Sequence, residues 1–147
     1  MMVKNHISEE IIQVLIHKAM DMLTFSYAPY SSFKVGAALL SESGEIYGGC
    51  NIENAAYSPT NCAERTAFFK AVSEGEKDFT AIAIVGGKNG EVTEYCPPCG
   101  VCRQVMREFC REEEFVVILA KSVTEYKVYT LSELFPEAFG PDSGVAN

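Results

Sequence analysis

Two cysteine motifs constrain the fold of this chain more than any other feature. The first, Asn61-Cys62-Ala63-Glu64-Arg65, lies where a loop gives way to a helical pattern. The second, Cys96-Pro97-Pro98-Cys99-Gly100-Val101-Cys102, again precedes a helical pattern. Three thiols and a carboxylate at these spacings suggest a zinc ion with a proton-handling partner. The fold must therefore bring two helix starts that are far apart in sequence to one point.

The composition is that of an ordinary globular domain. With 147 residues, the chain is long enough to bury one continuous core. Apolar residues make up 48% of the chain and charged residues 22%, which is typical of globular proteins. We expect a single domain over residues 1–147, in which residues 140–147 form a flexible tail. No apolar run approaches the ~18 residues of a membrane span, and the N-terminus lacks the apolar core of a signal peptide. These features predict a cytoplasmic protein without a membrane partner.

The charge balance argues against nucleic acid as a partner. The net charge is −8, the chain has only 12 lysines and arginines, and no basic cluster is present. A protein that follows a phosphate backbone needs the opposite balance. A small neutral ligand suits this chain better.

The six cysteines point to metal binding or catalysis, because a cytosolic chain rarely forms disulfides. Cys50 and Cys110 fall in apolar patterns, and we interpret them as small buried hydrophobes. Cys62, Cys99 and Cys102 lie in the two motifs, and Cys96 belongs neither to these candidate ligands nor to the buried hydrophobes. His6 and His17 lie far from the cysteine motifs in sequence, so we interpret both as surface residues rather than metal ligands.

The hydrophobic pattern predicts an alternation of helices and strands. Ser8 reads as the cap of a first helix, and Thr130-Leu131-Ser132-Glu133 reads as the capping box of a short last helix. Between them we expect a loop at 26–32, a hairpin of 33–41 with 46–52, helices over 61–72 and 101–110, and strands over 79–85, 115–120 and 125–129. Strand–helix–strand alternation implies parallel pairing with right-handed crossovers. The predicted fold is an α/β three-layer α/β/α sandwich with a mixed sheet of about five strands.

Helix starts suit cysteine ligands, because unpaired N–H groups and the helix dipole favour thiolate over thiol. Three thiolates leave the fourth tetrahedral position of zinc open, where a water can bind and its pKa can fall toward ~7. Glu64 could be a fourth ligand, a partner of the helix dipole or a proton shuttle, and we favour the shuttle. Arg65 could form a surface ion pair, or it could bind the ligand sulfurs and draw charge from them.

The motif C-A-E followed by P-C-x-x-C is the signature of zinc-dependent nucleobase deaminases. More narrowly, the chain resembles the small homotetrameric cytidine deaminases of the cytidine/deoxycytidylate deaminase family. The resemblance covers five ordered segments: Tyr27–Ser31, Phe33–Ala38, Gly49–Ala55, Asn61–Ala67 and Pro98–Gln104.

The resemblance implies hydrolytic deamination of cytidine and deoxycytidine to uridine and deoxyuridine with release of ammonia, a step of pyrimidine salvage. It implies one Zn²⁺ per subunit, bound by Cys62, Cys99 and Cys102. Glu64 would take a proton from the zinc-bound water that attacks C4, pass it to N3 and help to expel the amine.

The resemblance also implies the residues that bind the nucleoside. Asn51 and Glu53 would bind the ribose hydroxyls, although the residue types alone equally suit a turn. Phe33 would pack on the substrate, unless it is simply a core strand residue, and the backbone at Ala63 would contact the pyrimidine. Tyr57 and Phe139 would reach the site from neighbouring subunits of a homotetramer.

Several alternatives stay open at this point. The substrate could be another aminopyrimidine nucleoside of the blasticidin type. In a different class, the chain could be a non-catalytic structural zinc protein, which would need a fourth protein ligand, and Cys96 is the only nearby candidate.

A Cys96–Cys99 chelate is conceivable beside the favoured Cys99–Cys102 pair. A redox C-x-x-C protein would leave Cys62 and Glu64 unexplained. A cysteine at the first ligand position argues against the dimeric, deoxycytidylate and polynucleotide branches.

Overall fold

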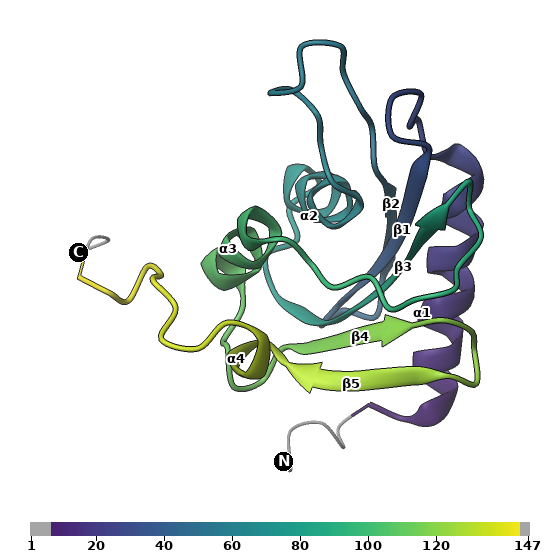
Figure 1. Cartoon of the computed structure of the whole chain (residues 1–147). Helices are drawn as coiled ribbons and strands as arrows, with labels where there is room; N and C mark the ends of the chain where they lie inside the picture. The colour runs from purple at the N-terminus through teal and green to yellow at the C-terminus, as the bar shows by residue number, and fades with distance from the viewer. Residues whose placement is uncertain (1–6, 145–147) are drawn as a thin grey trace.

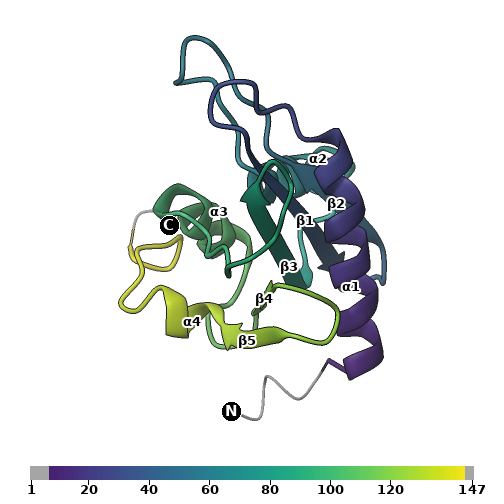
Figure 2. The same cartoon turned by 45° about the vertical axis from the view of Figure 1, so that its right-hand side comes forward.

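A computed structural model describes residues 7–144, and its elements form three layers (Figures 1 and 2). Helix α1 (Glu9–Met22), followed by the short 3-10 helix η2 (Leu23–Phe25), covers one face of a sheet. Helices α2 (Ala63–Ser73) and α3 (Gly100–Phe109) pack side by side on the other face. The predicted three-layer α/β/α sandwich is confirmed.

The sheet has five strands in the order β2-β1-β3-β4-β5. The strands are β1 (Phe33–Ser41), β2 (Ile46–Cys50), β3 (Phe79–Lys88), β4 (Val116–Ala120) and β5 (Tyr126–Thr130). Strands β3 and β4 are parallel and are joined through α3, whereas the other three neighbouring pairs are antiparallel. Strands β2 and β3, joined through α2, run in the same direction but are separated by β1. The sheet is therefore mixed, as the sequence predicts.

Most predicted boundaries lie within one residue of the observed ones, but helix α2 begins at Ala63, two residues after its predicted start, and two strand ends also differ more. Strand β3 continues three residues past the predicted end at position 85, because Gly86, Gly87 and Lys88 pair with the first residues of β1. Strand β2 stops at Cys50 instead of position 52. Ile52 instead forms isolated bridges with Tyr27 and Asn61, which tie the loop before α2 to the loop after η2.

Strand β3 is the centre of the molecule and is covered on both faces. Its alternate side chains enter two separate apolar layers, as the period of a strand requires. Toward α1 lie Leu15, Ile16, Ala19, Ala81, Ala83 and Val85. Toward α2 and α3 lie Phe68, Ile82, Ile84, Met106 and Leu119. Double coverage explains why residues 79–85 read as one nearly continuous apolar run.

A glycine lets α2 lie directly against β2. A Cβ atom at Gly49 would lie 2.4 Å from the carbonyl oxygen of Ala63 and 2.6 Å from the amide nitrogen of Ala67. No larger residue fits between the strand and the first turns of the helix without a shift. This close approach fixes the start of α2, where Cys62 is located.

The predicted caps and exposures are also observed. The Ser8 hydroxyl accepts a hydrogen bond from the amide of Ile11, and Thr130 and Glu133 form the capping box of α4 (Leu131–Leu134). His17 is exposed on α1, and Cys50 and Cys110 are buried. His6 and residues 145–147 lie outside the described residues. No helix within residues 7–144 is long and apolar enough to cross a membrane.

Candidate active site

The starts of α2 and α3 bring three sulfur atoms together. Cys62 and Cys99 are the N-cap residues of these two helices, and Cys102 lies in the first turn of α3. The Cys62 sulfur lies 3.9 Å from that of Cys99, which lies 3.6 Å from that of Cys102. All three sulfur atoms lie within 4.8 Å of one another.

This spacing fits a zinc ion. With Zn–S bonds of ≈ 2.3 Å at tetrahedral angles, ligand sulfurs lie about 3.8 Å apart. Among residues 7–144, this is the only group of three or more His, Cys, Asp or Glu side chains close enough to share a metal, and it contains no fourth member. Three protein ligands with an open fourth position are typical of a catalytic zinc site rather than a structural one.

Arg65 lies against this cluster. Its Nη2 atom donates to the sulfur of Cys62 across 3.2 Å. A hydrogen bond from Cys102, and then the guanidinium of Arg65, lower the pKa of Cys62 to about 5, whereas the pKa of Cys102 is raised by the same shared hydrogen bond and by burial. The arginine therefore favours the thiolate form of Cys62.

Glu64 is a buried carboxyl group beside the cluster. Only 4% of its surface is exposed, and burial raises its pKa to about 7. A carboxyl group with a pKa near neutrality can both accept and release a proton at physiological pH. This environment suits the proton shuttle better than a simple dipole partner, which would remain ionised at the surface.

A cleft of about 210 Å³ opens beside these groups. It is lined by Val35, Asn51, Glu53, Thr60, Asn61, Cys62, Ala63, Glu64, Cys96, Pro97 and Cys99. Cys62, Cys99 and the buried carboxyl group of Glu64 thus share one cavity with Asn51 and Glu53, which follow β2. Asn51, Glu53 and Ala63 lie in the cleft wall.

Asn51 and Glu53 also hold the surrounding loops. The side-chain oxygen of Asn51 accepts hydrogen bonds from Ser26 Oγ at 2.5 Å and from the backbone amide of Val35 at 2.9 Å. Its side-chain nitrogen donates to the backbone carbonyl of Phe33 at 2.8 Å. Sequence reasoning missed Ser26, whose place just before the Tyr27–Ser31 segment was the available signal.

The Glu53 carboxylate accepts hydrogen bonds from the amides of Tyr30 and Ser31 and from the Ser31 hydroxyl. The hydroxyl contributes most to lowering the pKa of Glu53. Sequence reasoning did not identify Ser31 as a partner of Glu53, although both belong to segments that carried the resemblance. The turn-forming and cleft-lining interpretations of Asn51 and Glu53 are therefore compatible.

The three aromatic candidates do not line this cleft in the single chain. Phe33 is partly exposed at the start of β1, and its ring lies near Gly86, where an added Cβ atom would be 3.2 Å away. Tyr57 is 76% exposed with a left-handed backbone (φ 64°) and lines an adjoining hollow with Glu53 and Thr60. Phe139 is 58% exposed on the C-terminal segment.

Cys96 lies in the cleft wall but outside the group of three sulfurs. An added Cβ atom at Gly86 would lie 2.9 Å from its sulfur, so the thiol packs over the glycine at that point of β3. Burial raises the pKa of Cys96 to about 12, which keeps it a neutral thiol. Cys96 is therefore a neutral thiol that packs over Gly86 and forms part of the cleft wall.

Comparison with known proteins agrees with this geometry. The family of the cytidine and deoxycytidylate deaminase zinc-binding region matches residues 9–119. A cytidine deaminase of Sporosarcina psychrophila is 49% identical over 89% of this chain and 93% of its own length, and one of Halalkalibacterium halodurans is 50% identical over 86% and 92%. The crystal structure of cytidine deaminase from Burkholderia pseudomallei superposes with a TM-score of 0.76 at 43% identity, covering 86% of this chain and 97% of that one. The chain belongs to the cytidine and deoxycytidylate deaminase family.

Proposed function

We propose that this protein catalyses the zinc-dependent hydrolysis of cytidine and deoxycytidine to uridine and deoxyuridine with release of ammonia. The observation that carries the proposal is that three cysteine sulfurs lie within 4.8 Å of one another beside a cleft that Cys62, Cys99 and the buried Glu64 line. The relatives that match most of the chain are cytidine deaminases, which supports this choice of substrate.

Cys62, Cys99 and Cys102 would hold the zinc, which when bound supplies a coordinated water of lowered pKa as the nucleophile. Arg65 would withdraw charge from Cys62, because three thiolates otherwise leave the site with a formal charge of −1. Glu64 would carry one proton from the water to N3 of the pyrimidine and a second to the departing amine. One water is consumed, the C4–N bond breaks and ammonia leaves.

The walls of the cleft would orient the nucleoside. Asn51 and Glu53 would bind the ribose hydroxyls, the backbone at Ala63 would contact the pyrimidine, and the exposed ring of Phe33 would pack on the substrate. The firm anchoring of Asn51 and Glu53 supports this role, because prepositioned polar groups cost little entropy on binding.

Tyr57 and Phe139 would complete the cleft of a neighbouring subunit in a homotetramer. Their exposure on the single chain supports this, since large aromatic side chains at a surface commonly mark contact sites. Six free cysteines suit a cytoplasmic location.

The direct test is loss of cytidine followed by ultraviolet absorbance, with and without a zinc chelator. We expect chelator-sensitive conversion to uridine by the wild type. The Glu64→Gln variant should keep its zinc and lose about 10²–10⁴-fold in kcat, since it retains the shape of the side chain and removes the proton carrier. If zinc-loaded wild type leaves cytidine unchanged, or if Glu64→Gln is fully active, the proposal is wrong.

A further inference from the structure

Helix α3 holds the C-terminal segment of the described chain through three polar side chains. Arg103 Nη1 donates to the carbonyl of Leu134 at 2.6 Å, and Gln104 Nε2 donates to the carbonyl of Phe139 at 2.8 Å. Arg107 Nη2 pairs with the Asp142 carboxylate at 2.5 Å. These donors are spaced so that they share one face of the helix. The helix that carries Cys99 and Cys102 in its first turn therefore also anchors the segment that carries Phe139.

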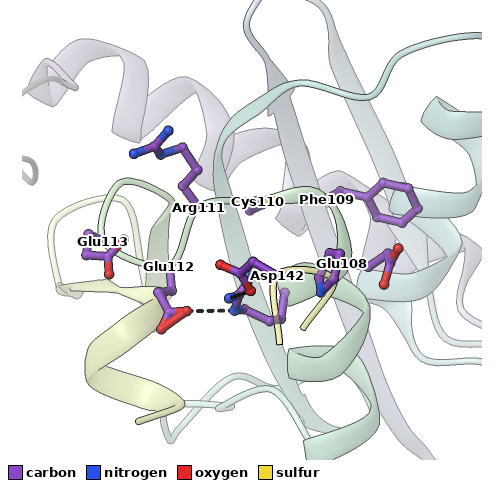
Figure 3. A pocket seen from close by; sticks show the side chains of 9 residues that line it. Glu108, Phe109, Cys110, Arg111, Glu112, Glu113 and Asp142 are labelled. Carbon is purple, nitrogen blue, oxygen red and sulfur yellow. Dashed lines mark hydrogen bonds and ion pairs between the residues drawn. The ribbon is translucent and has the colours of Figure 1, made fainter. Parts of the chain in front are cut away.

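Arg107 lies where three segments meet. Its side chain is only 9% exposed, and its Nε atom lies 2.6 Å from the carboxylate of Glu112 in the turn after α3. A Cβ atom at Gly140 would lie 2.6 Å from the guanidinium carbon, so the backbone there lies directly on the arginine. Figure 3 shows Glu112 and Asp142 converging on this point, with a dashed line for the ion pair of Glu112.

The hollow around Arg107, about 400 Å³, has no unmatched positive charge to attract an anion. The buried guanidinium faces two carboxylates, and Glu108 and Glu113 also line the hollow. Arg111 points to solvent and pairs with Glu114. The arrangement is a junction between segments rather than a ligand site.

Few other bonds hold the C-terminal segment to the protein. Within the described part of residues 136–144, the bonds to the rest of the chain are those from Gln104 and Arg107, and the others, between Gly140 and Ser143, are local. The segment has no helix or strand. Its placement, and with it the place of the exposed Phe139 ring, therefore depends on these two side chains.

We propose that Arg107, acting with Gln104 and paired to Asp142, is a positioning residue that fixes Phe139 for contact with the nucleoside. The inference rests on the proposed function, in which Phe139 completes the cleft of a neighbouring subunit. Loosening this junction weakens substrate binding and leaves the chemical step intact, because the three sulfurs and Glu64 are untouched.

The test uses Asp142→Asn rather than a change at Arg107. Removing the buried arginine would leave Glu112 without its partner and destabilise the fold, whereas the Asp142 side chain is 74% exposed and pairs with Arg107. Because the Asp142 partner of the pair is solvent-exposed, the contact should contribute ~0.2–1 kcal/mol, so KM for cytidine should rise by up to about fivefold. The kcat, zinc content and Tm should stay at wild-type values. The separate Asp142→Glu variant keeps the negative charge and should retain most of the wild-type affinity for cytidine. Asp21→Asn, on the exposed face of α1, is the matched control.

A double-mutant cycle shows whether Asp142 acts through Phe139. In a Phe139→Ala background, Asp142→Asn should raise KM no further. Additive effects of the two changes on KM, or a wild-type KM for Asp142→Asn, would overturn the proposal.

Cleavage of the zinc-loaded protein by chymotrypsin after Phe139 tests the junction without measuring activity. The Asp142→Asn protein should be cut several times faster than the wild type and the Asp21→Asn control. Equal rates would overturn the positioning role even in an active deaminase. Faster cleavage in a protein that does not deaminate cytidine would overturn the proposed function and leave the junction itself established.

Discussion

At the scale of single residues, the N-cap positions of α2 and α3 give up stability for chemistry. An N-cap serine, threonine or aspartate would accept a hydrogen bond from the helix backbone, typically contributing ~1 kcal/mol. Neither Cys62 nor Cys99 forms such a side-chain bond, although both have the extended backbone of a cap. Their sulfurs are instead directed at each other. The lost capping energy is consistent with selection for metal binding at these two positions.

The charge of Arg65 should matter more than its size. Arg65→Gln removes the positive charge 3.2 Å from the Cys62 sulfur and keeps a donor amide, so electron density stays on the thiolate and turnover should fall with only modest zinc loss. Steady-state kinetics and zinc analysis measure the two effects. Arg111→Gln, at an exposed arginine outside the cluster, serves as the control. Unchanged turnover in Arg65→Gln would contradict the assigned role.

Cys96 and Cys102 should differ in zinc retention. Cys96→Ser should keep a full equivalent of zinc, because its sulfur lies outside the group of three, whereas Cys102→Ser should lose most of it. Zinc measured after gel filtration distinguishes the two variants. The reverse result would mean that Cys96–Cys99 is the true chelate.

At the scale of elements, the contact between β2 and α2 sets the position of the first metal ligand. Gly49→Ala would force the helix start away from the strand, because the added carbon would lie 2.4 Å from the Ala63 carbonyl oxygen. We expect a loss of about 1–3 kcal/mol in the free energy of unfolding, together with weaker zinc binding. Gly100→Ala in α3 is a suitable control, since the nearest atom to its added carbon is 3.8 Å away. Denaturant unfolding that shows equal stability for the two variants would refute this reason for the glycine.

The stability of the loop between η2 and β1 should depend on pH, because the Glu53 carboxylate holds this loop. Because its pKa is lowered in the folded protein, first by the Ser31 hydroxyl, the ionised carboxylate stabilises the loop above the ordinary pKa of glutamate. That stabilisation is lost as the pH falls through the lowered value. Ser31→Ala should raise the pKa of Glu53, observable by NMR titration, and the stability difference from wild type should shrink in acid. A Glu53→Gln protein should lack this pH dependence, and an unshifted pKa in Ser31→Ala would contradict the assignment.

At the scale of the whole molecule, zinc would join two helices that otherwise meet through a shared apolar layer. Ligands from both helix starts mean that the ion binds the folded chain far better than the unfolded one. Chelation should therefore lower Tm by about 5–10 °C, as expected for ~2.7 kcal/mol in a domain of this size when free zinc exceeds Kd a hundredfold. Calorimetry of the Cys102→Ser protein should show no effect of the chelator, and a wild-type Tm that ignores chelation would argue against a bound metal.

Much of the molecule could be predicted because its signals are local. The Ser8 cap, the capping box at Thr130 and the start of β3 each depend on neighbours within a few residues, and each prediction is confirmed, whereas the end of β3 lies three residues beyond its predicted position because those residues pair with β1. The predicted end of β2 is also wrong, because Ile52 pairs with Tyr27 and Asn61 from other segments, and no local pattern encodes such a partner.

The sequence by itself determined the elements, the family resemblance and the candidate chemistry of Cys62, Glu64, Cys99 and Cys102, since residue type and spacing carry that information. Only the tertiary structure decided that Cys96 lies outside the group of three sulfurs, that Glu64 is buried, and that α3 holds the segment of Phe139. Burial and distance between remote residues arise from how the layers pack. In this protein, the approach of α2 and α3 on one face of the sheet turns two separate motifs into one site.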